Sequence, residues 1–485
     1  MVFPVVGGDG KPTGYEISNS CQFNTDAYCE FTPSSGSGST QFTYSAWVKN
    51  CGAGGQSETG MILSGAGAGS GADNGIQLSA GGSAGKIQFI EYDGGDNAYY
   101  IRTNRLFRDP PAWFHLVLIY DAPDSTAGDR MRLYINGTRE TSFSHEVQLP
   151  QDRAHAGFTR SSVAIRIGSQ ASGSNSRFNG YLADVYFCDG QNYEPSEFGE
   201  TDDNGVWIPK EADVSFGTNG FKLEFKQTGT SANSSGIGAD TSGNDNHFSV
   251  SGLAAENITT DTPTNNFATM NPLANFYAEH TFSEGNCKIV TENSANHYSY
   301  STSTMGVANG KWYAEFKASA KSGGNDWFSV GVAEAMGTAS NLTLGRDTGH
   351  TSSDEAGQIG WVGYGTDFVY QNDAYYSGST SDYDTDAYGV GDILSVALDA
   401  DNNRVYFYKN GTIQNSGTHF NIGVSPTGFW HFAVGDFDNQ NYTWECNFGN
   451  APFSISSGNS DANGYGNFEY AVPSGYYALC TKNLA

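Results

Sequence analysis

The sequence lacks any apolar run long enough to cross a bilayer as a helix. Its longest strongly apolar run covers residues 113–120, whereas a membrane-spanning helix needs about 20 such residues. The first residues contain no basic segment followed by an apolar stretch, so we expect no export signal. We therefore expect a soluble protein that does not insert into membranes and that, if it acts outside a cell, leaves it by a route other than secretion.

Positive charge is scarce. The 485 residues include 24 Lys and Arg but 52 Asp and Glu, which gives a formal net charge of −28. A surplus of that sign repels DNA, RNA and anionic membranes, so we expect no nucleic-acid partner. The simplest use of such a surface is solubility at high concentration or in salty water, where dissolved ions screen the self-repulsion.

Short motifs for metal and phosphate chemistry are missing as well. The sequence has no Cys-x-x-Cys pair, no His-x-x-x-His pair and no Gly-x-x-x-x-Gly-Lys loop, which argues against a zinc or nucleotide site. Of seven cysteines, only Cys21, Cys29 and Cys51 lie near one another, and a disulfide between two of them stays open. The other four cysteines are widely spaced and are expected to be small core residues.

The residues that are abundant indicate β-structure. Glycine contributes 62 residues and aromatic side chains 14% of the chain, in short alternating stretches separated by turn residues. Residues 392–411 are typical of a β-hairpin whose second strand ends in Asn-Gly, and residues 113–137 repeat the same design. Because single cores stop growing at about 250–300 residues, one hairpin type used twice predicts two β-sandwiches.

Several stretches of the first half resemble the successive signatures of laminin-G-like, concanavalin-type jelly rolls. They are residues 45–49, 113–118, 133–137, 167–168 and 178–186. More narrowly, residues 178–187, taken with residues 198–202 and 205–209, are similar to virion proteins of marine tailed bacteriophages. The resemblance covers residues 13–270 or so, and it implies a jelly roll carried on a virus particle.

The last part of the chain resembles a SPRY domain, a bent two-sheet sandwich used for recognition. The stretches that carry the resemblance follow the family's order and are residues 310–316, 328–333, 359–361, 388–411 and 428–434. The sequence departs from the family between Ala333 and Gln358, where a loop rich in Gly, Ser and Asp stands. Binding loops vary there among SPRY domains, so the resemblance implies no specific ligand.

These observations predict an all-β protein of two concanavalin A-like sandwiches in tandem. We place a laminin-G-like jelly roll with an N-terminal arm at residues 1–253 and a SPRY-like sandwich at residues 276–485. Residues 254–275 are polar and interrupted by proline, as expected for a linker.

An aromatic loop between Trp361 and Tyr388 is the main ligand-binding candidate. Tyrosine rings pack on the C–H faces of sugars, while amide and carboxylate groups bond their hydroxyls. We assign Trp361 and Phe368 to the core. The binding candidates are Tyr370, Tyr375, Tyr376 and Tyr383 with Asn372 and Asp373, and a smaller candidate pair on the first sandwich is Tyr99 and Tyr100.

Metal binding is a weaker candidate. Asp382, Asp384 and Asp386 alternate, so in a strand their carboxylates would share one face and suit Ca²⁺. Jelly rolls of the laminin-G-like group often hold calcium at a loop rim, which the resemblance would extend to this chain. The alternative is that these are solvated turn aspartates in an acidic protein. We expect no other cofactor.

Catalysis is not expected. Laminarinase-like enzymes among concanavalin-type jelly rolls carry a Glu-x-Asp-x-x-Glu strand, and a glycosidase needs two carboxylates about 5–10 Å apart. Glu91 and Asp93 are the nearest approach, but Asp96 stands where the second Glu should be and glycines interrupt the strand.

The sequence is therefore interpreted as a non-enzymatic bacteriophage virion surface protein, such as a head or tail fibre, appendage or decoration, that binds host-surface glycan. Its expected partners are other capsid or tail proteins and, by family analogy, two further copies in a trimer. It would be assembled in the host cytoplasm and released by lysis as part of the virion. Two alternatives stay open: a protein that coats or cements the capsid, and a depolymerase of host polysaccharide.

Overall fold

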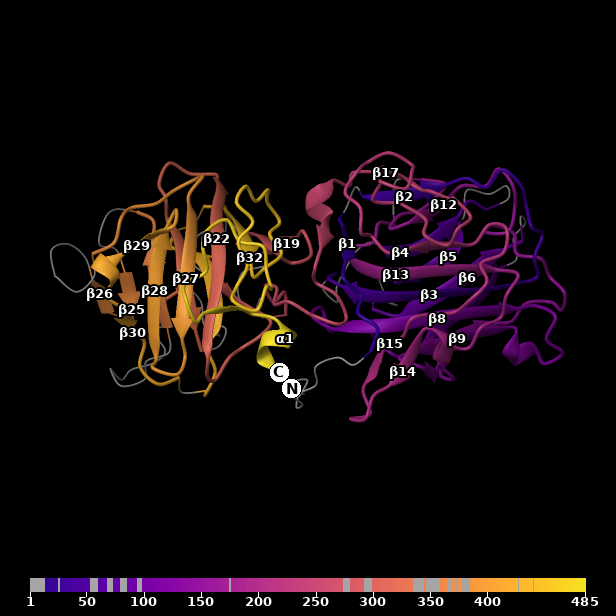
Figure 1. Ribbon diagram of the computed structural model, residues 1–485, viewed down its shortest axis with the longest axis horizontal. Helices are drawn as coiled ribbons and strands as arrows, with labels where there is room; N and C mark the ends of the chain where they lie inside the picture. The colour runs from indigo at the N-terminus through magenta and orange to yellow at the C-terminus, as the bar shows by residue number, and fades with distance from the viewer. Residues whose placement is uncertain are drawn as a thin grey trace. The chain divides into compact units, whose positions relative to one another are not determined.

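The computed structural model describes most of the chain. The described residues are 14–24, 27–52, 60–67, 73–78, 85–93, 98–173, 176–273, 280–291, 299–334, 344–345, 358–364, 369–371, 374–376, 384–425, 427–438 and 440–485. Among them, residues up to Asn266 form one compact unit and residues from Phe267 onward form another (Figure 1). We call these the first and the second unit.

Two eight-stranded sheets build the first unit from its described residues. The first sheet runs in the order β10-β9-β8-β3-β13-β1-β18, with β16 also paired to β13. Its strands are β1 (Ser20–Phe23), β3 (Gln41–Asn50), β8 (Trp113–Asp121), β9 (Met131–Ile135), β10 (Thr138–Arg139), β13 (Gly180–Asp189), β16 (Phe221–Leu223) and β18 (Ile258–Thr259).

The second sheet of this unit runs in the order β11-β7-β6-β5-β4-β12-β2-β17. Its strands are β2 (Tyr28–Phe31), β4 (Gly60–Gly65), β5 (Asn74–Leu78), β6 (Ile87–Tyr92), β7 (Ala98–Thr103), β11 (Phe143–Val147), β12 (Ile165–Ile167) and β17 (Ser249–Ser251). A separate ribbon joins β14 (Gly199–Thr201) to β15 (Trp207–Pro209), and short 3₁₀ helices are η2 (Ala127–Asp129), η3 (Pro195–Glu197) and η4 (Ala255–Asn257).

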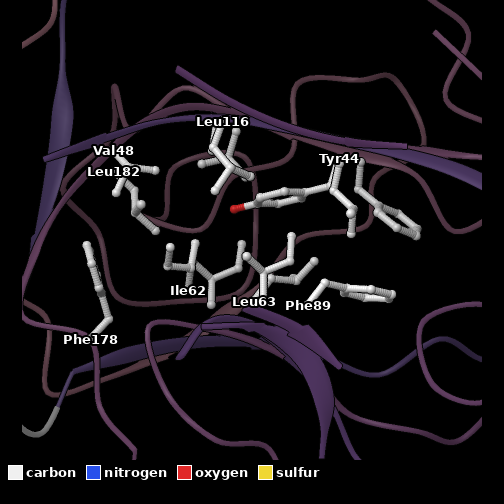
Figure 2. Packing of buried hydrophobic residues seen from close by; sticks show 14 of the residues in the cluster. Tyr44, Val48, Ile62, Leu63, Phe89, Leu116, Phe178 and Leu182 are labelled. Carbon is white, nitrogen blue, oxygen red and sulfur yellow. The ribbon is translucent and has the colours of Figure 1, made fainter. Parts of the chain in front are cut away.

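The core of the first unit lies between its two sheets. In Figure 2, Tyr44 and Leu116 of the first sheet and Leu63 and Phe89 of the second lie in the space between the two sheets. Alternate residues of β3 face this core because successive side chains of a strand point to opposite faces. On the other face of β3, Trp47 packs under Tyr15, Trp113 and Trp207, so the outer face of the first sheet is covered as well.

The second unit is also a two-sheet sandwich. A nine-stranded sheet has the order β19-β20-β32-β22-β27-β28-β29, with β30 on β28 and β33 parallel to β22. Its strands are β19 (Thr281–Ser283), β20 (Lys288–Val290), β22 (Lys311–Lys321), β27 (Ile393–Asp399), β28 (Arg404–Lys409), β29 (Thr412–Ile413), β30 (Phe420–Asn421), β32 (Tyr442–Asn447) and β33 (Tyr477–Ala478).

A six-stranded sheet in the order β21-β31-β23-β24-β25-β26 faces it. Its strands are β21 (Tyr300–Thr302), β23 (Phe328–Ala333), β24 (Gln358–Val362), β25 (Val369–Gln371), β26 (Ala374–Tyr376) and β31 (His431–Asp436); helices η5 (Asn415–Gly417) and α1 (Thr481–Leu484) are short. The prediction of an all-β protein with two sandwiches in tandem is confirmed. No helix in the described ranges is long and apolar enough to span a membrane.

The chain divides inside the segment 254–275 that the sequence predicted to be a linker. Before the division, the Asp261 carboxylate pairs with the Lys49 ammonium at 2.6 Å, and both side chains are buried in the first unit. After it, Phe267 and Met270 enter cores of the second unit, and the Ala268 N–H donates to the Leu479 carbonyl. The described part of this segment is therefore folded onto one unit or the other.

All seven cysteines are buried as thiols outside any disulfide. The disulfide left open by the spacing of Cys21, Cys29 and Cys51 is not formed. Burial raises the pKa of the Cys21 and Cys29 thiols, which keeps them protonated and unreactive at neutral pH.

Candidate functional site

A polar and aromatic face lies on the outer side of β6, β7 and β11 in the first unit. The Tyr100 ring stacks on the His145 ring, with centroids 4.0 Å apart and planes 17° from parallel. The Arg102 guanidinium carbon lies 5.9 Å from the Tyr100 ring centroid, and Arg102 Nε donates to Gln88 Oε1 at 2.5 Å. Because Tyr100 and Arg102 are two residues apart in one strand, both face outward, and pairing brings Gln88 opposite Arg102.

This face, formed by Gln88, Tyr100, Arg102 and His145, combines an aromatic surface with hydrogen-bonding groups. Tyr100 and Arg102 are half-buried and His145 is exposed, whereas Gln88 is buried beside Arg102. Gln88 therefore orients the Arg102 guanidinium from beneath. A ring that offers apolar surface next to a guanidinium can hold a sugar by its C–H face and bond its hydroxyls.

Tyr99 lies on the opposite side of β7. It packs against the buried core, and the Arg153 guanidinium carbon sits 4.9 Å from its ring centroid. The two adjacent tyrosines predicted as one candidate pair thus serve different faces, because neighbouring side chains of a strand alternate.

Glu91 is bonded on both carboxylate oxygens. Oε2 accepts a hydrogen bond from the Tyr120 hydroxyl at 3.0 Å, and Oε1 accepts from Arg153 Nε at 3.1 Å and from the Ala156 N–H at 3.0 Å. Burial raises the pKa of Glu91, although the nearby Arg153 charge acts in the other direction. Glu91 therefore fastens the segment around residues 153–156 to β6. Asp93 is half-buried, and Asp96 lies outside the described residues.

The aromatic loop of the second unit is described in part. Tyr370 of β25 pairs with Tyr375 of β26, and Tyr376 pairs with Val369, which makes this a hairpin at the edge of the six-stranded sheet. Trp361 is fully buried, which confirms its assignment to the core. The candidates Asn372, Asp373 and Tyr383, and the core assignment of Phe368, fall outside the described residues.

The aspartates predicted as a calcium site are likewise described in part. Asp384 and Asp386 are exposed on either side of buried Thr385, while Asp382 lies outside the described residues. Two amide side chains fix the backbone of these aspartates. The Asp384 N–H donates to Asn415 Oδ1 at 3.1 Å, and the Asp386 N–H donates to Gln414 Oε1 at 2.8 Å. Within the described ranges, no group of three or more His, Cys, Asp or Glu is arranged to hold a metal ion.

Three aromatic rings gather at one end of the second unit. Tyr364 stacks on Trp327 with ring centroids 4.1 Å apart and planes 24° from parallel, and Trp327 lies 5.2 Å from Phe437. Tyr364 lies within the aromatic loop between Trp361 and Tyr388 but is not among the binding candidates that the sequence predicted, and neither are Trp327 and Phe437. Strand alternation could have indicated an outward position for Trp327, because Phe328, Val330 and Val332 face the core and Trp327 does not share their spacing.

Comparison with known proteins gives one family match. Residues 23–191, about a third of the chain, match the model of the Concanavalin A-like lectin/glucanases superfamily. This confirms the resemblance of the first half to concanavalin A-like jelly rolls. No curated protein matches the sequence.

Similar solved structures cover both parts of the chain. The SPRY domain of human HERC1 is 15% identical over 36% of this chain and 96% of its own, with a TM-score of 0.25. The native heptameric SAP-like pentraxin from Limulus polyphemus is 14% identical over 43% of this chain and 94% of its own, with a TM-score of 0.29. Domains LG4-5 of the mouse laminin alpha1 chain are 11% identical over 98% of this chain and 90% of their own, with a TM-score of 0.30. At these TM-scores the similarities carry no argument about function.

Proposed function

We propose that the protein is a non-enzymatic carbohydrate-binding protein of a bacteriophage virion surface and that it adheres to host-surface glycan. The observation that carries the carbohydrate-binding part is the outer face formed by Gln88, Tyr100, Arg102 and His145. This face belongs to a sandwich whose sequence matches a superfamily of lectins and glucanases. The stacked rings and the adjoining polar groups supply the two kinds of contact that a sugar uses.

The virion part of the proposal rests on the resemblance of residues 178–187, 198–202 and 205–209 to virion proteins of marine tailed phages. The strongly acidic composition suits a particle that must stay dispersed in salt water. A trimer, proposed by analogy with phage fibres and appendages, would present each weak sugar site several times and strengthen attachment through multivalency. A calcium ion at the rim that includes Asp384 and Asp386 is part of the same proposal.

Hydrolysis of the glycan is the less favoured function. A glycosidase needs one carboxylate free to donate a proton and a second free to act as nucleophile or base. Glu91 begins the stretch most similar to the catalytic motif of laminarinase-like enzymes. Its side chain is buried, and its carboxylate accepts hydrogen bonds from Tyr120, Arg153 and Ala156. A coat or cement protein with protein-facing sandwiches is the other alternative.

Binding of the full-length protein to a glycan array and to host cells, with calcium and then with chelator, tests the proposal. We expect binding by the wild type, loss of at least part of it in Tyr100→Ala, and little change in Tyr99→Phe, whose ring still packs against the core. Loss of binding with chelator would implicate the aspartate rim. Absence of binding to every glycan and cell would reject adhesion and favour the cementing role. Release of reducing ends would instead indicate a depolymerase.

A further inference from the structure

The described part of the second unit contains a row of three aromatic rings, one exposed and two half-buried, that the function above does not use. We propose that Trp327, Tyr364 and Phe437 form a second carbohydrate site, which takes a neutral pyranose against the exposed part of the Tyr364 ring. This inference rests on the proposed carbohydrate-binding function and adds to it a separate site and a sugar class.

The pairing of three neighbouring strands explains why the rings form a row. Phe328 of β23 pairs with Asp436 of β31, and Ser329 of β23 pairs with Val362 of β24. Extending these antiparallel registers, by one residue toward β31 and by two toward β24, places Trp327 between Phe437 on one side and Tyr364 on the other. Neighbouring strands lie about 4.8 Å apart, which agrees with ring centroids separated by 4.1 and 5.2 Å.

Backbone hydrogen bonds fix the loops that carry the rings. The Phe437 N–H donates to the Trp327 carbonyl at 2.9 Å, and the Gly363 N–H donates to the Phe328 carbonyl at 3.0 Å. Beneath the row, Trp327 and Phe437 pack on the fully buried side chain of Val362. The rings are therefore held in place before any ligand arrives, which lowers the conformational cost of binding.

Tyr364 is more exposed than the neighbouring aromatic residues of the core. Tyr388 and Trp361 are buried, and the Tyr388 hydroxyl donates to the Trp361 carbonyl at 2.7 Å. Tyr364 is 45% exposed although its ring stacks on an indole. An immobilised tyrosine ring that remains accessible is a surface on which the C–H face of a pyranose can pack.

The polar groups of the same loops determine which sugars fit. Asp326 forms an ion pair with Lys321 at 2.7 Å, and Asp438 Oδ1 accepts the Gln440 N–H at 2.8 Å. Each carboxylate is adjacent in sequence to Trp327 or Phe437, and in the extended register adjacent side chains point to opposite faces, so these groups act on a bound sugar through their charge. Two carboxylates in a chain of net charge −28 repel uronate and sulfate groups, which leaves neutral sugars as the matching class.

The test is calorimetric titration of the full-length protein with neutral hexasaccharides of glucose and mannose and, separately, with an alginate hexasaccharide as the anionic probe. The proteins compared are the wild type, Tyr100→Ala, Tyr364→Ala, the double variant and Tyr364→Phe. We expect Tyr100→Ala to retain binding of a neutral hexasaccharide, and we expect the double variant to bind it at least about tenfold more weakly than Tyr100→Ala does. Tyr364→Phe, which keeps the ring, should bind more tightly than Tyr364→Ala, and thermal unfolding verifies that Tyr364→Ala remains folded.

Three results would overturn the second site while leaving the proposed function intact. They are loss of all sugar binding in Tyr100→Ala alone, equal affinity of Tyr100→Ala and the double variant, and alginate binding as tight as that of the neutral sugars. Unchanged sugar affinity together with a changed oligomeric state in Tyr364→Ala would assign the rings to a protein interface instead. A wild-type protein that binds none of the sugars would reject both the second site and the carbohydrate-binding function.

Discussion

His155 is a polar residue of the first unit that is held among aromatic rings. His155 accepts hydrogen bonds at Nδ1 from the Gly157 and Phe158 N–H groups at 3.0 Å, and its ring stacks on Phe158. Its Nε2 is buried and has no hydrogen-bond partner among the described residues. Burial, assisted by the charge of Arg153, lowers the pKa of His155 from 6.5 to about 3. The folded protein thus keeps this imidazole neutral where the unfolded chain would protonate it.

Acid should therefore destabilise the first unit through His155. Because the folded pKa lies below the unfolded one, this contribution to stability is complete above about pH 6.5 and is lost as the pH falls toward 3, by at most about 1.4 kcal/mol per pH unit. His155→Asn, which can still accept from the two N–H groups, should show a smaller fall in urea-unfolding free energy between about pH 7 and pH 4. All other titrating groups are common to the wild type and His155→Asn, so only the difference between their stability profiles reports on His155. Parallel profiles of unfolding free energy against pH would contradict the prediction.

Single residues were predictable where strand alternation decides their environment. His115 lies in the apolar run of residues 113–120, a position that predicts a satisfied core or sheet-face residue. It is buried, pairs through Nε2 with the Ser45 hydroxyl at 2.8 Å and accepts at Nδ1 from Trp207 Nε1 at 3.1 Å. The identity of its partners could not be predicted, because Trp207 comes from a segment 92 residues away that folds over the outer face of the sheet.

At the scale of elements, the two predicted hairpins share more than their Asn-Gly ends. In the first unit, the Asn136 side chain accepts from the His115 N–H at 2.7 Å, and the Asn136 N–H donates to the His115 carbonyl at 2.9 Å. In the second unit, Asn410 makes the same two bonds with Ile393, at 2.9 and 2.8 Å. Both asparagines have positive φ, which this residue tolerates. The asparagine therefore ties the end of the hairpin's second strand to its first strand with its side chain as well as its backbone.

The glycine that follows is required for two separable reasons. Gly137 has φ +72°, and a Cβ there would lie 2.4 Å from the Trp207 ring. Gly464 has φ +81°, but a Cβ there would meet no heavy atom within 4 Å. Substitution of Gly464 therefore measures the cost of the backbone conformation alone. We expect Gly464→Ala to cost about 1–2 kcal/mol and Gly137→Ala clearly more, as measured by urea unfolding. Equal losses would show that Trp207 moves aside without cost.

At the scale of the whole molecule, the fold followed from the sequence more readily than the sites did. Hairpins such as β27–β28 are local, and their apolar alternation and turn residues are legible in the chain. The row of Trp327, Tyr364 and Phe437 depends on the register of three strands that are distant in sequence. Register is set by tertiary packing, which no single stretch records, so only the tyrosine inside an aromatic-rich loop attracted notice.

The division of the chain can be tested by truncation, because it differs from the boundary that composition suggested. A fragment of residues 1–253 would lack β18 and Asp261, leaving the Lys49 ammonium buried without the carboxylate that it contacts at 2.6 Å. Breaking a buried ion pair on one side costs about 3–5 kcal/mol, so this fragment should be much less stable than a fragment of residues 1–266.

In the shorter fragment, Lys49→Met removes the unpaired charge and should recover part of the lost stability. In the longer fragment, the same substitution leaves the buried Asp261 carboxylate without its ion-pair partner and should lower the stability. If Lys49→Met raises the unfolding free energy of the shorter fragment and lowers that of the longer one, this ion pair assigns residues 254–266 to the first unit. Equal stability of the two unsubstituted fragments in urea would instead make those residues a linker in function, whatever contacts they form.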